Sequence, residues 1–117
     1  MRTVYICSPL AGDIMENINN VRRYTEYALR CGMAPVVPHF YALCVDDRNP
    51  EDRDLGMKAG LQLMDMCDEI WVFGTERSRG MLKEIDYATR VLRIPICLID
   101  LKTVDDFLAR KGGCCHE

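Results

Sequence analysis

The 117-residue sequence contains no apolar run long enough to span a membrane, and its first residues lack the apolar core of a secretory signal. It also lacks an excess of positive charge, since its formal net charge is −3, which argues against general binding to nucleic acid or anionic membranes. Neither a G-x-G-x-x-G fingerprint nor a Walker A lysine is present. These absences predict a cytoplasmic protein without a cofactor, whose ligand is a small molecule.

A disulfide framework is not expected either, although seven cysteines are many for this length. Their number is odd, and most lie in apolar runs such as Ile96-Cys97-Leu98, where a free thiol packs as a small apolar side chain. This pattern is typical of a reducing compartment. Cys114-Cys115-His116 could bind a metal, but no second pair stands at zinc spacing. We therefore predict no metal site and a flexible tail over residues 110–117.

Strand-like and helix-like segments alternate along the chain and predict one domain over residues 1–117. Runs rich in β-branched and apolar residues predict strands, buried except for the proline-flanked second one, which suits a sheet edge: Thr3–Cys7, Ala34–Pro38, Ile70–Phe73 and Ile94–Ile99. Capping residues predict helix starts near Asp13, at Asn49-Pro50 and at Ser78. Helices are also predicted over Leu55–Cys67 and from Thr103 to Arg110. The alternation predicts an α/β fold with a parallel sheet between two layers of helices.

The stretch Gly74–Tyr87 organises the chain, because it joins a buried strand to a helix through a loop of small residues. Ser78 suits the N-cap of this helix, whose apolar face carries Met81, Ile85, Ala88 and Leu92. Glu84 falls on that apolar face, near the helix start, where backbone N–H groups attract anions. A carboxylate in this position needs a partner or a function. The alternative is that Glu84 lies at the edge of the face and reaches solvent.

Three loops follow the ends of predicted parallel strands: Ser8–Gly12, His39–Asp47 and Gly74–Gly80. Ligands of such sheets bind outside the carboxyl ends of the strands, so we expect these loops to meet at one cleft beneath Glu84. Other assignments stay open. His39 could line the cleft or pack under a loop, and the polar residues 46–54 could form a lid or an ordinary solvated loop. Asn17, Asn20 and Arg23 share one helix face, which could simply be solvated.

Three motifs together resemble the nucleoside 2-deoxyribosyltransferase-like superfamily: Val4-Tyr5-Ile6-Cys7-Ser8-Pro9, Cys67-Asp68-Glu69-Ile70-Trp71-Val72-Phe73-Gly74, and Ser78-x-Gly80-Met81-x-x-Glu84-Ile85-x-x-Ala88. The resemblance runs from Arg2 to about Ile99 and is strongest to a short, uncharacterised phage and bacterial branch, a DUF4406-like domain of unknown function. It implies a flavodoxin-like or Rossmann-like three-layer sandwich with a parallel sheet of four to five strands. It also implies a homo-oligomer.

The resemblance further implies that Glu84 attacks C1′ of a nucleoside or nucleotide and that Tyr5 orients it. Ser8 and the loop residues Pro9, Leu10 and Gly12 match the pocket wall near the sugar. Ser78 matches a serine that binds the 5′-phosphate in nucleotide-hydrolysing relatives. Gly80 and Arg23 are the other candidate phosphate ligands, and His39 and Met81 complete the candidate substrate-binding set.

One position departs from the family pattern, because Gly60 stands where a second acid is expected to protonate the leaving group. Asp47 is the candidate replacement, with Asp54 and Asp65 as alternatives. The sequence therefore predicts cleavage or transfer of the N-glycosidic bond of a (deoxy)nucleoside 5′-monophosphate. A non-catalytic nucleotide-binding module is the alternative, and a structural subunit that uses residues 46–54 as a contact surface is a third possibility.

Overall fold

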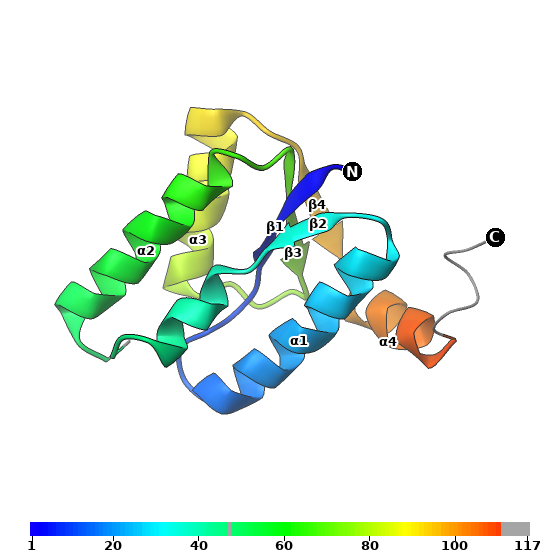
Figure 1. Ribbon diagram of the computed structural model, residues 1–117, viewed down its shortest axis with the longest axis horizontal. Helices are drawn as coiled ribbons and strands as arrows, with labels where there is room; N and C mark the ends of the chain where they lie inside the picture. Colours follow the sequence, from blue (N-terminus) through cyan, green and yellow to red (C-terminus); the bar gives the residue numbers. More distant parts are fainter. Residues whose placement is uncertain (47, 111–117) are drawn as a thin grey trace.

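The computed structural model describes residues 1–46 and 48–110, which form a parallel sheet covered by helices. In chain order the elements are β1 (Thr3–Cys7), α1 (Ile14–Arg30), β2 (Ala34–Val36), η1 (Pro38–Leu43), α2 (Pro50–Met64), β3 (Glu69–Phe73), α3 (Arg79–Asp86), η2 (Tyr87–Leu92), β4 (Ile96–Ile99) and α4 (Leu101–Ala109) (Figure 1). The four strands are parallel in the order β2-β1-β3-β4. The predicted α/β class and sheet are confirmed.

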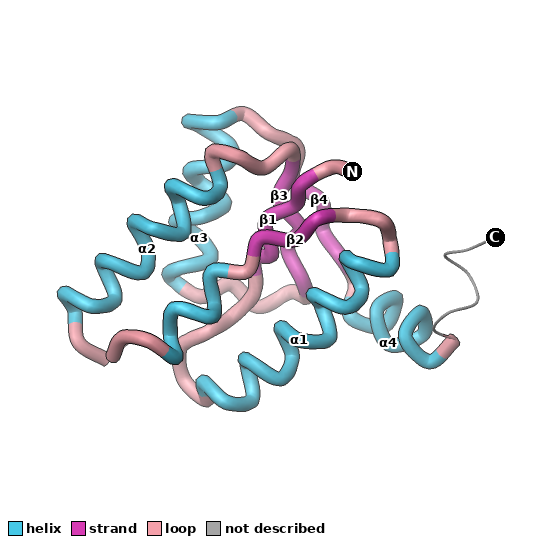
Figure 2. Tube along the Cα trace, viewed as in Figure 1, coloured by secondary structure: helices cyan, strands magenta, loops and turns pink. Residues whose placement is uncertain are grey.

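The sheet separates two helical layers, and side-chain alternation along β1 shows why. Val4 and Ile6 point to one face, where they pack against α1 and α4. Tyr5 and Cys7 point to the other face, toward α2 and α3. Figure 2 shows the same division, with α1 and α4 on one side of the strands and α2 and α3 on the other. The result is a three-layer sandwich in which each face of β1 serves a different core.

The helix starts follow the predicted capping chemistry in all but one case. Asp13, Asn49 and Ser78 accept hydrogen bonds from backbone N–H groups in the first turns of α1, α2 and α3. The cap of α4 is Asp100, whose Oδ2 accepts from the Thr103 backbone N–H at 3.3 Å, so the prediction that this helix begins at Thr103 was wrong. The helix begins as soon as β4 ends, which leaves Asp100 as the flanking residue.

The two outer strands expose more of the sheet than the sequence predicts. β2 lies at one edge, as expected, and pairs only with β1 over three residues. β4 lies at the other edge and pairs only with β3. Leu98 is 70% exposed, so the prediction of a fully buried strand at Ile94–Ile99 was wrong. Within the described residues, no element lies beyond β4 to pair with its outer edge.

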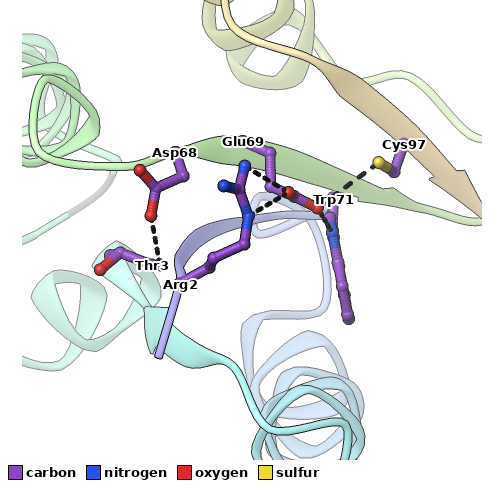
Figure 3. Close-up of polar contacts among 6 residues, drawn as sticks. All are labelled: Arg2, Thr3, Asp68, Glu69, Trp71 and Cys97. Atoms are coloured by element: carbon purple, nitrogen blue, oxygen red, sulfur yellow. Dashed lines mark hydrogen bonds and ion pairs between the residues drawn. The ribbon is translucent and has the colours of Figure 1, made fainter.

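Glu69 connects the amino ends of β1, β3 and β4 through hydrogen bonds (Figure 3). It lies at the opposite end of the strands from the loops that follow their carboxyl ends. Its Oε2 accepts from Arg2 Nε at 3.2 Å and Nη2 at 3.1 Å, beside the start of β1. Its Oε1 accepts from Trp71 Nε1 at 2.6 Å and from Cys97 Sγ at 3.6 Å. The Trp71 hydrogen bond is the main reason that the pKa of Glu69 lies below its usual value.

No helix of the described residues is both long enough and apolar enough to cross a membrane. Cys7, Cys44, Cys67 and Cys97 have free thiols.

Candidate active site

A cavity of about 470 Å³ opens at the carboxyl end of β1, on the face of the sheet that carries α2 and α3. The chain leaves β1 toward β2 on one side, whereas β3 pairs on the other side, so this is the point where the strand order reverses. Its wall includes Tyr5, Ser8, Leu10, Gly12, His39, Arg48, Asp52, Arg53, Met57, Ser78, Arg79, Gly80, Met81 and Glu84. The predicted convergence of the loops after β1, β2 and β3 therefore occurs, although Gly74 itself is not part of this wall.

Glu84 lies in the second turn of α3 and points inward to the cavity, with 9% of its surface exposed. Its Oε2 accepts a hydrogen bond from the Tyr5 hydroxyl, and its Oε1 accepts one from Cys7 Sγ at 3.4 Å. Both donors belong to β1 and share its face, because they are two residues apart. The alternative that Glu84 reaches solvent was wrong.

Burial tunes the protonation of this group of three side chains. It raises the pKa of Glu84 to about 7, against the opposing effect of the two hydrogen bonds from Tyr5 and Cys7. Burial is also the first cause that raises the pKa of Tyr5 and of Cys7, and the nearby Glu84 carboxylate raises them further. Tyr5 and Cys7 therefore stay protonated and donate, while Glu84 changes its charge near neutral pH. Perturbed carboxyl groups of this kind are characteristic of functional sites.

Ser8 and His39 form a buried pair in the cavity wall. His39 Nε2 lies 3.1 Å from both the hydroxyl and the backbone carbonyl oxygen of Ser8. A carbonyl oxygen only accepts, so we assign the ring proton to Nε2. Burial lowers the pKa of His39, which keeps the ring neutral, and its Nδ1 has no hydrogen-bond partner among the described residues. His39 thus lines the cavity.

The start of α3 brings backbone N–H groups and small side chains to the cavity. Ser78 Oγ accepts from the Met81 backbone N–H at 3.2 Å, and Ser78, Gly80 and Met81 all line the wall. A Cβ atom on Gly80 would come within 3.3 Å of Met57 Cε, so a larger residue would crowd the wall. Arg79 follows Ser78 at the same helix start, and Arg48 also lines the cavity. The site therefore combines a helix N-terminus with guanidinium groups, which suits an anionic group.

Gly60 lies inside α2, and its missing side chain makes room for Tyr5. A Cβ atom there would lie 3.0 Å from Tyr5 Oη and 3.4 Å from Pro38 Cβ. An acid at position 60 would therefore displace the hydroxyl that binds Glu84. The structure explains in this way why the chain departs from the expected pattern.

The predicted substitutes for that acid are not in the cavity where the structure describes them. Asp54 pairs with Lys58 at 2.9 Å on the surface, and Asp65 accepts from the Tyr87 hydroxyl at 2.6 Å. Neither lines the cavity, so neither is placed to protonate a leaving group there. Asp47 lies outside the described residues. Among the described wall residues, Asp52 is the one acid besides Glu84.

Two predicted substrate-binding residues lie elsewhere. Arg23 pairs with Asp105 of α4 at 2.7 Å, on the opposite side of the sheet from Glu84, so its prediction as a phosphate ligand was wrong. Helical spacing groups Arg23 with Asn17 and Asn20 but does not show which layer the helix joins. Pro9 lines a separate hollow of about 140 Å³, together with Asn17 and Asn20.

Sequence reasoning missed several side chains of the site, among them Cys7, Arg48, Asp52 and Arg79. The alternation of β1 places Cys7 on the same face as Tyr5 and would have found it. Arg79 directly follows the N-cap Ser78, which is a local signal. Arg48 and Asp52 lie in the polar stretch 46–54, where nothing local distinguishes a wall residue from a solvated one. In the described part of the chain, no cluster of His, Cys, Asp and Glu side chains could hold a metal ion, and residues 114–116 lie outside that part.

Comparisons with known proteins agree with this architecture. The solved structure of a 2-deoxyribosyltransferase from the psychrotolerant bacterium Bacillus psychrosaccharolyticus superposes with a TM-score of 0.64, over 84% of this chain and 72% of that chain. The two sequences are 20% identical, so this likeness establishes a shared fold. No curated protein matches the sequence significantly.

A protein-family model matches residues 2–99 and carries the description "Domain of unknown function (DUF7768)". These are the same residues, Arg2 to about Ile99, over which the sequence resembles the deoxyribosyltransferase-like superfamily. The more specific DUF4406-like branch stays a prediction. The chain belongs to the DUF7768 family, and it has the fold of a 2-deoxyribosyltransferase.

Proposed function

We propose that this protein cleaves or transfers the N-glycosidic bond of a (deoxy)nucleoside 5′-monophosphate, with Glu84 as the nucleophile. The observation that carries the proposal is the buried Glu84 carboxylate, which has one donor on each oxygen and faces a cavity of about 470 Å³. A cavity of that size is typical of small-molecule sites. The fold shared with a 2-deoxyribosyltransferase supports the same class of reaction.

The reaction is a displacement at the anomeric carbon. An electron pair of the Glu84 carboxylate forms a bond to C1′, and the pair of the C1′–N bond leaves with the base. The base takes up a proton from an acid, for which Asp47 is the predicted residue and Asp52 is the acid in the described wall. Water or a second base then attacks C1′ and gives its proton to the acid, which has become a carboxylate. The C1′–Oε bond breaks with its electron pair on Glu84, which restores that carboxylate and releases the sugar or the new nucleotide. Tyr5 keeps the carboxylate in place throughout.

The monophosphate preference rests on the start of α3 and on the arginines around it. Ser78 is the N-cap of α3 and Gly80 lies in its first turn, and Arg48 and Arg79 add positive charge to the same cavity. A phosphate near this helix N-terminus would meet backbone N–H donors and guanidinium groups. Arg48 and Arg79 thus take the part that the sequence predicted for Arg23. Arg48 already pairs with Asp46 at 3.2 Å, so a neutral nucleoside would leave the N-terminus of α3 without an anionic ligand.

A second candidate function is a module that binds a nucleotide without cleaving it. Gly60 favours this reading, because the space of an expected acid is filled by the Tyr5 hydroxyl. The same cavity would then hold an intact ligand. Such a ligand raises the melting temperature and is recovered unchanged. Homo-oligomerisation stays a prediction, which light scattering of the purified protein measures.

The test incubates purified protein with a panel of nucleosides and their 5′-monophosphates and follows free base by chromatography. We expect release from monophosphates, and its loss in Glu84→Gln. Glu16→Gln, which changes an exposed glutamate on α1, is the matched control and should keep full activity. The proposal fails if the wild type releases no more base than Glu84→Gln. A melting-temperature rise with intact nucleotide in that case supports the binding module.

A further inference from the structure

The thiol of Cys7 has no part in the reaction described so far, yet it contacts the reacting carboxylate directly. Cys7 is the last residue of β1 and is fully buried. Its Sγ lies 3.4 Å from Glu84 Oε1, while the Tyr5 hydroxyl binds Oε2. One strand therefore supplies a separate donor to each carboxylate oxygen.

The two donors differ in strength. A phenolic O–H is a strong donor, whereas a thiol S–H is a weak one. Oε2 is therefore held firmly by Tyr5, and Oε1 keeps more of its lone-pair density free. Burial raises the pKa of the Cys7 thiol, so it stays a donor and does not place a second negative charge beside Glu84.

The attack on C1′ makes the two oxygens unequal. The oxygen that bonds to C1′ becomes the ester oxygen, which accepts hydrogen bonds poorly, and the other becomes a carbonyl oxygen, which still accepts well. The least hydrogen-bond energy is lost if the oxygen that becomes the ester oxygen is Oε1, which accepts the weak hydrogen bond from Cys7. We propose that Cys7 is a positioning residue that aims Glu84 Oε1 at C1′, so that Oε1 forms the glycosyl–enzyme bond while Oε2 stays bound to Tyr5.

This inference rests on the proposed function and specifies its first step. An Oε1 electron pair forms the Oε1–C1′ bond, the C1′–N pair leaves with the base, and the thiol keeps its proton throughout. Two other titratable groups act on the trio: Arg77 on Cys7 and Cys67 on Tyr5. Neither donates a hydrogen bond to Glu84 within the described structure. A substitution of Cys7 should therefore shift the pKa of Glu84 directly.

The experiment compares Cys7→Ser and Cys7→Ala with the wild type. Serine is a stronger donor of similar size, so it should lower the pKa of Glu84 and shift the acid limb of the kcat/KM profile to lower pH by about one unit. The stronger hydrogen bond should also make Oε1 less nucleophilic and reduce the plateau kcat about tenfold. Alanine removes the donor and should move the acid limb up by about one pH unit. KM should change little in either variant. Cys97→Ser is the matched control, because Cys97 is a partly buried thiol that also contacts a glutamate, Glu69, with Sγ 3.6 Å from its Oε1, and it does not line the cavity.

A second readout does not depend on turnover. The carboxyl carbon of Glu84 is titrated by ¹³C NMR without substrate in each variant, and its midpoint should move in the same directions. If neither the profile nor the midpoint moves in Cys7→Ser relative to Cys97→Ser, the inference is overturned even where nucleotide is cleaved. If the wild type cleaves nothing, the proposed function fails, and the NMR midpoints alone show whether Cys7 holds Oε1. Cys7→Ser keeps the test decisive if Cys7→Ala does not fold.

Discussion

Replacing Glu84 with glutamine should stabilise the protein in neutral and alkaline solution, because the substitution removes a buried charge. The pKa of this carboxyl is about 7 in the folded protein, against an ordinary value of 4.5. The folded state therefore holds the proton more tightly than the unfolded state. The wild type loses stability as pH rises from 4.5 through 7, and the loss is complete above that range. A difference of this size corresponds to about 3 kcal/mol.

The assay is urea unfolding of the wild type and Glu84→Gln between about pH 5 and pH 8, under reducing conditions. The difference in unfolding free energy should grow with pH by about 3 kcal/mol, which is about 10 °C in melting temperature for a domain of this size. His39 has the opposite effect, since its lowered pKa reduces stability as the solution becomes acidic. Both proteins contain His39, so its contribution cancels in the difference.

Glu16→Gln serves as the control for loss of one negative charge, because Glu16 is exposed. Its unfolding curve should differ from that of the wild type by the same small amount at every pH. Parallel curves for Glu84→Gln and the wild type across the whole range would refute the reasoning. They would mean that Glu84 keeps an ordinary pKa and that its burial has no electrostatic consequence.

Three further substitutions test other parts of the structure. Gly60→Ala places a Cβ atom 3.0 Å from Tyr5 Oη, and we expect a loss of about 1–3 kcal/mol by urea unfolding, with turnover reduced as well; unchanged stability would contradict the close approach of α2 to Tyr5. Ser78→Ala removes the cap of α3 and should reduce stability by about 1 kcal/mol, whereas no change would show that the cap is dispensable. Leu98→Glu should change stability by less than about 0.5 kcal/mol, since Leu98 is exposed on an edge strand, and a larger loss would indicate that another surface covers it.

Much of this fold could be predicted because local patterns report burial. The β-branched run at Thr3–Cys7 and the apolar run at Ile70–Phe73 became central strands. The spacing of apolar residues around Glu84 predicted that this carboxylate lies on the inner face of its helix. The strand–helix order predicted that the loops after β1, β2 and β3 meet at the carboxyl ends of the strands. These features depend on neighbours within one or two turns of chain.

The errors concern relations between distant segments. A run such as Ile94–Ile99 has the same composition whether a strand is central or outermost, and its exposure depends on whether another strand lies beside it. Arg23 is similar, since its helix could have joined either layer. The Gly60 position is the clearest case, because only the packing of α2 against Tyr5 shows why a side chain is absent there.

The outer wall of the cavity depends on the weakest strand of the sheet. Residues of η1, including His39, follow directly after β2, which has three residues and a single neighbouring strand. The carboxylate and its two donors belong instead to α3 and to the central strand β1. Amide protons of β2 and η1 should therefore exchange with solvent faster than those of β1, through openings that leave the reactive centre intact. Entry to the cavity can then be adjusted by substitutions at this margin without altering the chemistry at its floor.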